Sequence, residues 1–370
     1  MKWRDHALAE SIGLDSANRR RSVTDLDARG VHGLLPDGRE VISFASNDYL
    51  GLSHHPAVVA AAHDALDRWG AGATSARLIV DSRPVHSELE QELARWKSCE
   101  SALLFPSGFA TNYGVLTALG EPGVLVCSDE RNHASIVDGC RASRGYVAVY
   151  PHNDLTSLER LLSDSSRTIV VTETVFSMDG DIAPVHDLAR LCAHHEALLV
   201  LDEAHAVLGP DPDLSHNEAL RVGTLSKFLG CSGGFVAGPA PLIDLILNRA
   251  RSGIFTTALA PADAAASLAA LRVLRSSEGG GLRARLRHNI DLLSPGHPAP
   301  MIPVIVGSEQ GTLDAASILL DEGFLVPAIR PPTVPPGTSR LRVTLSADHD
   351  ERDVVRLGRA LSTLEMHAGV

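Results

Sequence analysis

The chain has 370 residues, which is too long for one simple core, so we expect a large domain and a smaller one. Its composition, 44% hydrophobic and 21% charged, is that of an ordinary soluble globular protein. A net charge of -12 disfavours nucleic acid as a main partner. The polar start of the chain lacks the apolar stretch of a signal peptide, and no apolar run reaches the roughly 18 residues of a membrane span. We therefore expect a cytoplasmic protein with no membrane partner.

The cysteines and histidines indicate neither disulfides nor metal. The five cysteines are scattered without a C-x-x-C pair, and their odd count favours reduced thiols. The neighbouring pairs His54 and His55, and His194 and His195, have no further ligands close by in the sequence. We expect no metal site.

The first 45 residues are expected to form an N-terminal segment. It reads as a helix with a basic end at residues 19–21, followed by a short hairpin around Asp37. Helical periodicity returns at His55–Trp69 and Val85–Lys97, with a loop of glycine and small residues between them.

From residue 101 to residue 237, short apolar strands alternate with helical stretches. This alternation predicts an α/β fold with a mainly parallel central sheet and helices on both faces. Ligands of such sheets bind beyond the carboxyl ends of the strands. The expected strands are Ala102–Phe105, Val124–Cys127, Tyr146–Tyr150, Thr168–Glu173, Leu198–Asp202, Arg221–Leu225 and Gly234–Ala237.

The last third of the chain predicts a second domain. Residues 241–275 read as one long helical region, and the three glycines at 279–281 read as a break. Strand, helix, strand and helix then follow at Met301–Val306, Thr312–Glu322, Arg340–Leu345 and Asp350–Leu364. We place the large domain at 46–275 and a smaller C-terminal α/β domain at 276–370.

Two successive strand ends carry an acid and then a lysine. The strand A-L-L-V-L ends at Asp202, with His205 three residues later, and the next strand runs into Thr224, Ser226 and Lys227. Pyridoxal phosphate needs this pair, because a lysine amine forms a Schiff base with its aldehyde and an aspartate keeps its ring nitrogen protonated. An acid and a lysine on unrelated strand ends are the alternative interpretation.

The segment F-P-S-G-F-A-T-N follows a strand and opens a helix. Backbone N–H groups at a helix start bind phosphate, and Gly108, between Ser107 and Phe109, would let the anion come close. A plain strand-to-helix turn is the alternative. Thr224 and Ser226 offer further hydroxyl donors.

Four other side chains near strand ends suit the same cofactor. His133 could stack on the ring or merely cap a helix, Ser177 could hydrogen-bond the cofactor, and His205 could donate to the ring oxygen. Glu173 could support neighbouring Asn or His groups.

Taken together, these segments resemble the α-oxoamine synthases, which are fold-type-I pyridoxal phosphate enzymes that join an amino acid to an acyl thioester. The resemblance rests on S-N-D-Y-L-G-L-S, F-P-S-G-F-A-T-N, V-F-S-M-D-G-D, D-E-A-H and T-L-S-K, and it spans roughly residues 3 to 365. The segment A-I-R-P-P-T-V-P-P-G-T-S-R-L-R resembles the branch that acts in biotin biosynthesis.

The resemblance implies a role for each matched residue. Lys227 would be the Schiff-base lysine and the base for the α-proton, Asp202 the partner of the ring nitrogen, and His133 the stacking residue. The remaining cofactor contacts would be Ser107, Gly108, Phe109, Ser177, His205, Thr224, and Thr256 and Thr257 from the partner subunit of a homodimer with shared active sites. Substrate contacts would be Arg342 for the amino-acid carboxylate, Arg19 and Thr333 for the acyl side, and His133.

The resemblance also implies the reaction. L-alanine and a pimeloyl thioester, carried by coenzyme A or a carrier protein, would condense with loss of carbon dioxide. A sister synthase that uses glycine, an aminotransferase on the same fold and a non-catalytic binding partner are the alternatives. Three departures from the family pattern are Ala206 in place of glycine, Asp81 in place of glycine, and a short loop over 206–221.

Overall fold

The computed structural model describes residues 2–163 and 167–368, and the side chains of the last helix as far as Leu364. The chain forms two compact units. The large unit comprises Leu50–Ser177 and Asp181–Arg283, and the small unit comprises Met1–Tyr49, Met178–Gly180 and Ala284–Val370. The expected domain boundaries at 45 and 275 stay a prediction.

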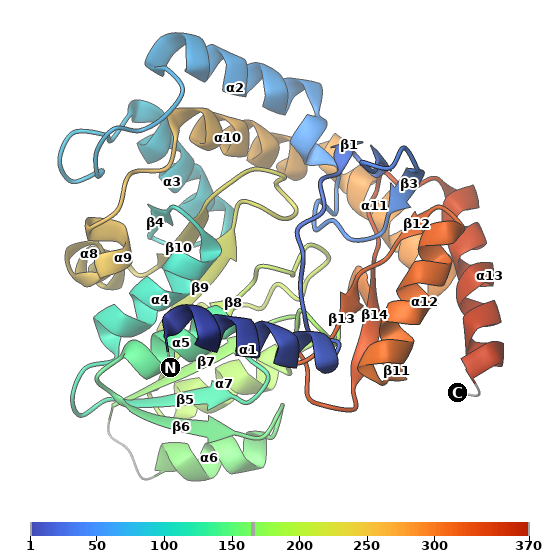
Figure 1. Cartoon of the computed structure of the whole chain (residues 1–370). Coiled ribbons are helices and arrows are strands. Elements are labelled where there is room, and N and C mark those ends of the chain that lie inside the picture. The colour runs from blue at the N-terminus through green and yellow to red at the C-terminus, as the bar shows by residue number, and fades with distance from the viewer. Residues whose placement is uncertain (1, 164–166, 369–370) are drawn as a thin grey trace. The chain divides into compact units, whose positions relative to one another are not determined.

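A seven-stranded sheet forms the centre of the large unit (Figure 1). Its strands β9, β8, β7, β5 and β6 are parallel, and β10 pairs antiparallel with both β9 and β4. The α/β fold with a mainly parallel sheet is thereby confirmed. In spatial order the strands are β4 (Ser101–Phe105), β10 (Gly234–Gly238), β9 (Ala219–Thr224), β8 (Leu198–Asp202), β7 (Thr168–Glu173), β5 (Leu125–Asp129) and β6 (Tyr146–Tyr150).

Helices cover both faces of this sheet, which explains why its strands read as continuous apolar runs. One apolar cluster joins the sheet to α4, α5 and α8, and a second joins its other face to α6 and α7. Helix α10 packs against α2 and α3. The helices of the large unit are η1 (Leu52–His54), α2 (Pro56–Trp69), α3 (Pro84–Trp96), α4 (Gly108–Leu119), α5 (Ala134–Ala142), α6 (Leu155–Ser163), α7 (Val185–His194), α8 (Ala240–Arg249), α9 (Arg251–Ile254) and α10 (Pro261–Arg275).

The small unit contains two further sheets. Strands β1, β2, β3 and β12 form one, and β11, β14 and β13 form the other. Its elements are α1 (Trp3–Ser16), β1 (Asp27–Arg29), β2 (His32–Leu34), β3 (Glu40–Ser43), β11 (Met301–Gly307), α12 (Glu309–Asp321), β12 (Phe324–Leu325), β13 (Ala328–Ile329), β14 (Ser339–Thr344) and α13 (Glu351–Ala368). Helix α11 (Ser277–Leu293) begins in the large unit and ends in the small one.

Two helical predictions were wrong in detail. The region 241–275 is three helices, because Ala250 adopts an extended conformation and Pro261 starts α10 afresh. The predicted break at glycines 279–281 lies instead at Ser276, and the glycines are inside α11. Each helical glycine costs about 1 kcal/mol relative to alanine. The buried side chains of Leu286 and Ile290 anchor the same helix and offset that cost.

The basic run at residues 19–21 was predicted as the end of the first helix, and this was also wrong. Helix α1 ends at Ser16, and Asn18 then adopts a left-handed conformation with φ of 54°. Asparagine tolerates this conformation better than most residues, so the helix stops there and the arginines follow in an extended segment.

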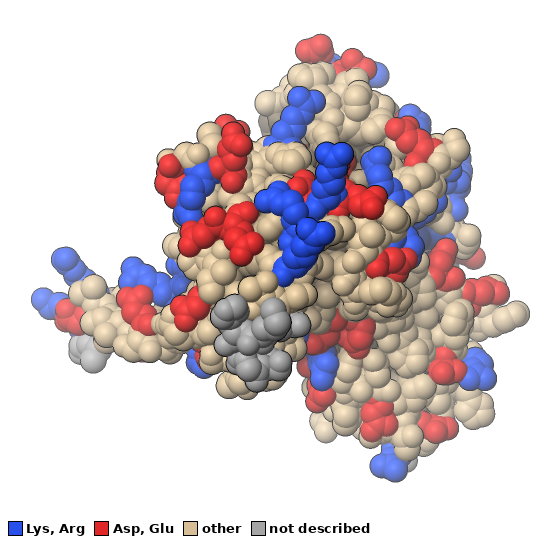
Figure 2. All heavy atoms as spheres, turned by 90° about the vertical axis from the view of Figure 1, so that its right-hand side faces the viewer, with Lys and Arg blue, Asp and Glu red and all other residues tan. Residues whose placement is uncertain are grey.

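The surface shown in Figure 2 carries acidic and basic side chains interspersed with one another. Within residues 2–163 and 167–368, no helix combines the length and the apolar content that crossing a membrane would require.

Candidate active site

Polar side chains gather at the carboxyl ends of the parallel strands. Glu173 ends β7, Asp202 ends β8, and these two residues lie opposite one another in the strand pairing. Thr224 ends β9, and Lys227 follows three residues later. The Nζ atom of Lys227 lies 2.7 Å from Nε2 of His205, which follows β8. The sheet thus brings Lys227 and His205 together although 22 positions separate them.

Lysine is rare in this chain, a signal that the sequence prediction did not use. Lys2, Lys97 and Lys227 are the three lysines of the sequence. Lys97 is buried, lies over the ring of Trp96 at 3.8 Å and forms a 2.6 Å ion pair with Glu203. Lys2 is exposed at the N-terminus. Lys227 is therefore the lysine whose position suits covalent chemistry at the strand ends.

The carboxylate of Asp202 is buried and held from both sides. Its Oδ1 accepts from the backbone N–H of Ala204 at 2.9 Å, and its Oδ2 accepts from Nδ2 of Asn112 at 2.6 Å. Burying an ionised carboxylate is unfavourable unless hydrogen bonds or an opposite charge compensate. Asn112 on α4 was not predicted as a site residue. Its position in the first turns of the helix that follows the glycine loop was the available signal.

His133 occupies the N-cap position of α5, so the capping interpretation describes its contact in the structure. Its Nδ1 accepts from the backbone N–H of Ser135 at 3.2 Å and lies 2.8 Å from the Ser135 hydroxyl. Although part of the residue is exposed, desolvation lowers the pKa of His133. The charge of Asp202 opposes this lowering of the pKa, and the charge of Lys227 adds to it. Stacking of His133 on a cofactor ring stays a prediction.

The start of α4 forms a cradle of donors. Ser107 is the N-cap and accepts from Ala110 N at 3.1 Å, and Gly108 is the first helical residue. A Cβ atom at Gly108 would lie 3.3 Å from Cβ of Thr224. A Cβ atom at Gly234 would lie 2.6 Å from the backbone N of Gly108. Glycine at both positions therefore lets β9 and β10 approach the helix start closely.

Two hydroxyls stand beside this cradle. Oγ1 of Thr224 lies 2.7 Å from Oγ of Ser226, and Ser226 N donates to Thr224 Oγ1 at 3.2 Å. Phe109, next in the helix, is exposed. The predicted phosphate-site residues Ser107, Gly108 and Thr224 are thus brought together.

Glu173 is fully buried beside Asp202. Desolvation, followed by repulsion from Asp202, raises the pKa of Glu173 to about 8. Backbone N–H groups of His133 and Ser177 donate to it, while its Oε1 has no hydrogen-bond partner among the described residues. Glu173 therefore ties the loops that carry His133 and Ser177 to the end of β7.

Thr256 and Thr257 follow α9 and lie beside the loop before α3. Ala258 N donates to Ser75 O at 3.0 Å, which joins the two segments. Asp81 accepts from the backbone N–H groups of Thr74 and Ser75 and so closes that loop. These bonds, with the Thr74 N–H first, lower the pKa of Asp81. The aspartate that replaces the expected glycine thus has a structural role here.

An ion-pair cluster holds the short loop over residues 206–221. Arg221 pairs with Asp211 of the loop and donates from Nε to Glu203 at 2.7 Å. Lys97 completes the cluster through Glu203. The loop is therefore anchored to the residue that follows Asp202 in the chain.

The predicted substrate contacts Arg342, Arg19 and Thr333 belong to the small unit. Arg342 is buried on β14 and donates to Thr344 Oγ1 at 3.1 Å and to Asn47 Oδ1 at 3.4 Å. Tyr49 donates from its hydroxyl to the same Asn47 oxygen at 3.0 Å. Asn47, which was not predicted as a site residue, orients the guanidinium.

The two predicted acyl-side residues do not contact one another. Arg19 forms a 3.0 Å ion pair with Glu309, while its neighbour Arg21 donates to the Thr333 hydroxyl at 3.0 Å. Arg330 donates to the carbonyl of Asn18. The extended segment after α1 therefore lies against the proline-rich loop within the small unit.

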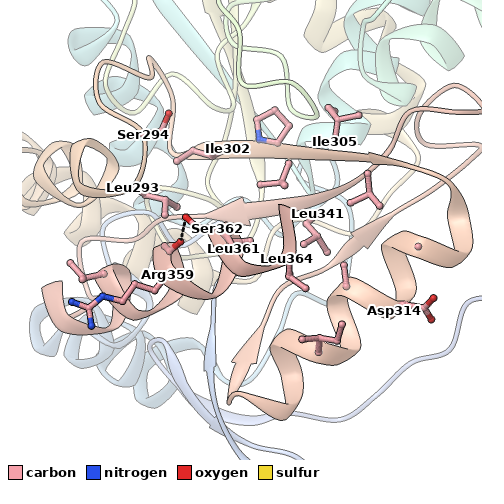
Figure 3. A pocket seen from close by; sticks show the side chains of 18 of the residues that line it. Leu293, Ser294, Ile302, Ile305, Asp314, Leu341, Arg359, Leu361, Ser362 and Leu364 are labelled. Atoms are coloured by element: carbon pink, nitrogen blue, oxygen red, sulfur yellow. Dashed lines mark hydrogen bonds between the residues drawn. The ribbon is translucent and has the colours of Figure 1, made fainter. Parts of the chain in front are cut away.

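A cavity of about 1070 Å³ lies elsewhere in the small unit (Figure 3). Apolar residues of β11 and β14, such as Ile302 and Leu341, line it together with α12 and α13. None of the predicted site residues lines it. Within the described part of the chain, no group of three His, Cys, Asp or Glu residues could hold a metal.

The residues of the large unit fit pyridoxal phosphate. Gly108 leaves the helix start open to an anion beside two hydroxyls, Asp202 supplies a fixed buried carboxylate, and Lys227 supplies an amine. Three kinds of group that the cofactor needs are thus present on neighbouring strand ends.

Comparison with known proteins agrees with this fit. The model of the class I and II aminotransferases matches residues 39–361. The 8-amino-7-oxononanoate synthase of Methylobacterium sp. (strain 4-46) is 45% identical over 368 residues, covering 97% of this chain and 96% of the relative. That of Geobacter sulfurreducens is 43% identical and covers 91% and 92%. A solved serine palmitoyltransferase from S. paucimobilis, described with a bound PLP–myriocin aldimine, has a TM-score of 0.91 at 27% identity over 99% of this chain and 98% of that one.

The family predicted from the sequence motifs is thereby confirmed. A match over nearly the whole length, at this identity, includes both units and every strand end described above. The chain belongs to the 8-amino-7-oxononanoate synthases, pyridoxal phosphate enzymes of the class I and II aminotransferase family.

Proposed function

We propose that this chain condenses L-alanine with a pimeloyl thioester to form 8-amino-7-oxononanoate, carbon dioxide and free thiol, in biotin biosynthesis. The observation that supports this best is the placement of Lys227, His205 and Asp202 on adjacent strand ends of a chain 45% identical to a synthase of that name. The glycine cradle at Gly108 stands beside them. An intact set of this kind argues against a non-catalytic paralogue.

The cofactor, when bound, supplies an electron sink for the negative charge that develops on the amino-acid Cα. Lys227 would hold the cofactor covalently and would take and return the α-proton at Nζ. His205, at 2.7 Å, would orient the amine. Asp202 would hold the ring nitrogen in its protonated form.

The remaining large-unit residues would fix the cofactor in place. Ser107, Gly108, Phe109 and Thr224 would bind the phosphate. Ser177 would hydrogen-bond the cofactor, and His205 would donate to the ring oxygen. His133 would lie against the ring face. We propose that the large unit described above corresponds to the cofactor domain.

Arg342 would bind the carboxylate of L-alanine. A buried guanidinium presents a rigid fork of donors, and its bonds to Thr344 and Asn47 hold that fork in one orientation. Thr333 and Arg19 would contact the acyl chain from the small unit. Because prolines around Thr333 fix their own φ angles, that loop is stiff.

Substrate choice is the direct test of the proposed reaction. We expect the fastest turnover with L-alanine and pimeloyl thioester when alanine and glycine are each assayed against pimeloyl, acetyl and succinyl thioesters by product mass. One methyl group in a pocket is worth about 1–3 kcal/mol, so alanine should exceed glycine by roughly 10- to 200-fold in kcat/KM. Faster condensation of glycine with acetyl or succinyl thioester would overturn the substrate assignment and leave the family unchanged. An amino acid turned over without any thioester would indicate an aminotransferase.

We further propose a homodimer that works in the cytoplasm, with Thr256 and Thr257 reaching the partner's phosphate site. An exposed apolar surface on the large unit supports this. Leu78, Ile79 and Val80 are 51%, 78% and 64% exposed, and Phe255, just before Thr256, is 70% exposed. Contiguous exposed apolar residues mark interaction surfaces. The odd number of cysteines, none of them paired, suits a reducing compartment.

Mixing two inactive variants tests whether active sites are shared. If Lys227→Ala and Thr257→Ala each reduce turnover severely, heterodimers should regain one intact site, so about a quarter of wild-type activity should return after random mixing of a two-fold dimer. Sedimentation should show the dimer. A fully active monomer would refute the proposal, and so would mixtures that stay at the level of their parents.

A further inference from the structure

A continuous hydrogen-bond chain joins Asp202 to His133. Nδ2 of Asn112 lies 2.6 Å from Asp202 Oδ2 and 2.9 Å from Ser135 Oγ. Ser135 Oγ in turn lies 2.8 Å from Nδ1 of His133. Asn112 is 2% exposed and Ser135 is 1% exposed, so water does not compete for the bonds of Asn112 to Asp202 and Ser135, whereas His133 at the far end is exposed. The chain crosses from β8 through α4 to α5 within the large unit.

Two groups that cannot change roles determine the directions of these hydrogen bonds: the Asp202 carboxylate at one end and the backbone N–H of Ser135 at the other. A carboxylate can only accept, so the amide of Asn112 must present its NH₂ group, and both of its hydrogens are then used. Ser135 Oγ accepts one of them, which leaves its own hydrogen free to donate to His133 Nδ1. The backbone N–H of Ser135 also points to Nδ1, at 3.2 Å. Nδ1 therefore receives two donors and carries no proton of its own.

We propose that Asn112 and Ser135 are positioning residues that keep His133 as a neutral imidazole with its proton on Nε2. This inference rests on the proposed role of His133 against the cofactor ring. A neutral ring can lie against a cationic pyridine ring, whereas an imidazolium would place two positive charges face to face. The proton on Nε2 remains available as a donor.

The charged groups around His133 do not produce this state by themselves. Asp202 favours the imidazolium and Lys227 disfavours it, while Glu173 accepts from the backbone N–H of His133. Desolvation is the largest cause that lowers the pKa of His133, and Lys227 lowers it further. The two donors at Nδ1 add to the effects of desolvation and of Lys227, because they make a proton at that atom unfavourable.

NMR of the protein, with and without pyridoxal phosphate, tests the proposal. The side-chain nitrogens of the 17 histidines are labelled with ¹⁵N, and the His133→Gln variant assigns the signal of interest. We expect Nδ1 of wild-type His133 to be unprotonated and Nε2 protonated at pH 7. A proton on Nδ1 would overturn the proposal.

Two variants test the hydrogen-bond chain from Asp202 to His133. Ser135→Ala removes one donor to Nδ1. Asn112→Leu removes the amide donor to the Ser135 hydroxyl, so that hydroxyl is less strongly directed to donate to Nδ1. Losing one hydrogen bond should raise the pKa of His133 by about 0.5–1 unit, from the usual worth of a single bond. The acid limb of the kcat/KM profile should move to higher pH by the same amount, because His133 becomes charged sooner as pH falls.

Ser128→Ala is the matched control. Ser128 is also buried, and its hydroxyl accepts from Asn132 Nδ2 at 2.9 Å at the same edge of the sheet, but it has no bond to His133. Its loss should leave the pKa of His133 unchanged. Equal shifts in the control and in Ser135→Ala would overturn the proposal, as would no shift in either test variant. Because the NMR readout does not require turnover, failure of the proposed reaction would be seen separately in the substrate assays.

Discussion

Replacing Lys227 with alanine is expected to abolish turnover, with a loss of at least about a thousandfold, because covalent attachment and proton transfer both need its amine. The amine lies 2.7 Å from His205 and beside the strand end of Asp202. Mass spectrometry after borohydride reduction of the enzyme should find the cofactor fixed to wild type at the peptide with Lys227. The variant should carry no covalent label there.

The small number of lysines makes this experiment sharp. Lys97→Arg is the control, because it removes the buried amine of Lys97 while keeping a cation for Glu203. It should keep the covalent label and most of the activity. Substantial condensation by Lys227→Ala, or a label that stays in that variant, would show that another group performs the chemistry.

Replacing Asp202 with asparagine should weaken cofactor binding by roughly 10- to 100-fold, since a hydrogen bond to a charged group is worth about 1.5–3 kcal/mol. Turnover should fall further, because a neutral amide cannot hold the ring nitrogen protonated. The geometry adds a second reason. Each carboxylate oxygen of Asp202 accepts one donor, from Ala204 and from Asn112, and an amide has only one acceptor oxygen. Cofactor titration by fluorescence and steady-state kinetics measure the two effects.

Asp129→Asn is the appropriate comparison for that variant. Asp129 is a buried carboxylate at the end of β5, where it accepts from Asn153 N at 2.9 Å and from His152. Its replacement should lower the free energy of unfolding and leave cofactor affinity nearly unchanged. If both variants lose cofactor affinity equally, Asp202 acts through stability and its assigned role is wrong.

The strands of the large unit were predictable because all but the edge strand β6, where Tyr146 and Val149 are exposed, are buried on both faces. Continuous apolar runs bounded by turns identify such strands. All seven predicted strands of residues 101–237 appear, three with the predicted bounds and four with ends shifted by one or two residues. The helices after residue 240 were less predictable. The residues there favour helix throughout, and the ends of the helices are set by the extended backbone conformation of single residues, as at Ala250 and Ser276.

The motif residues were predictable for a related physical reason. Parallel strands end at one edge, so a lysine and an acid that end neighbouring strands must meet, whatever the length of chain between them. The identity of the cofactor, and of Lys227, Asp202 and His205 as its candidate partners, therefore followed from local patterns and the resemblance they carry. The three departures from the family pattern were also visible in the sequence. Their structural consequences, such as the closure of a loop by Asp81, were not.

Tertiary structure alone decided how these residues are supported. Asn112 and Asn47 lie within motifs that support the resemblance, but neither they nor Ser135 reveal their partners in the sequence, because those partners lie far away along the chain. Asn112 meets Asp202 across 90 positions only because α4 packs on the sheet whose central strand is β8. Local residue patterns thus determine which chemical groups reach the strand ends, while packing between distant segments determines the orientation and proton placement of those groups.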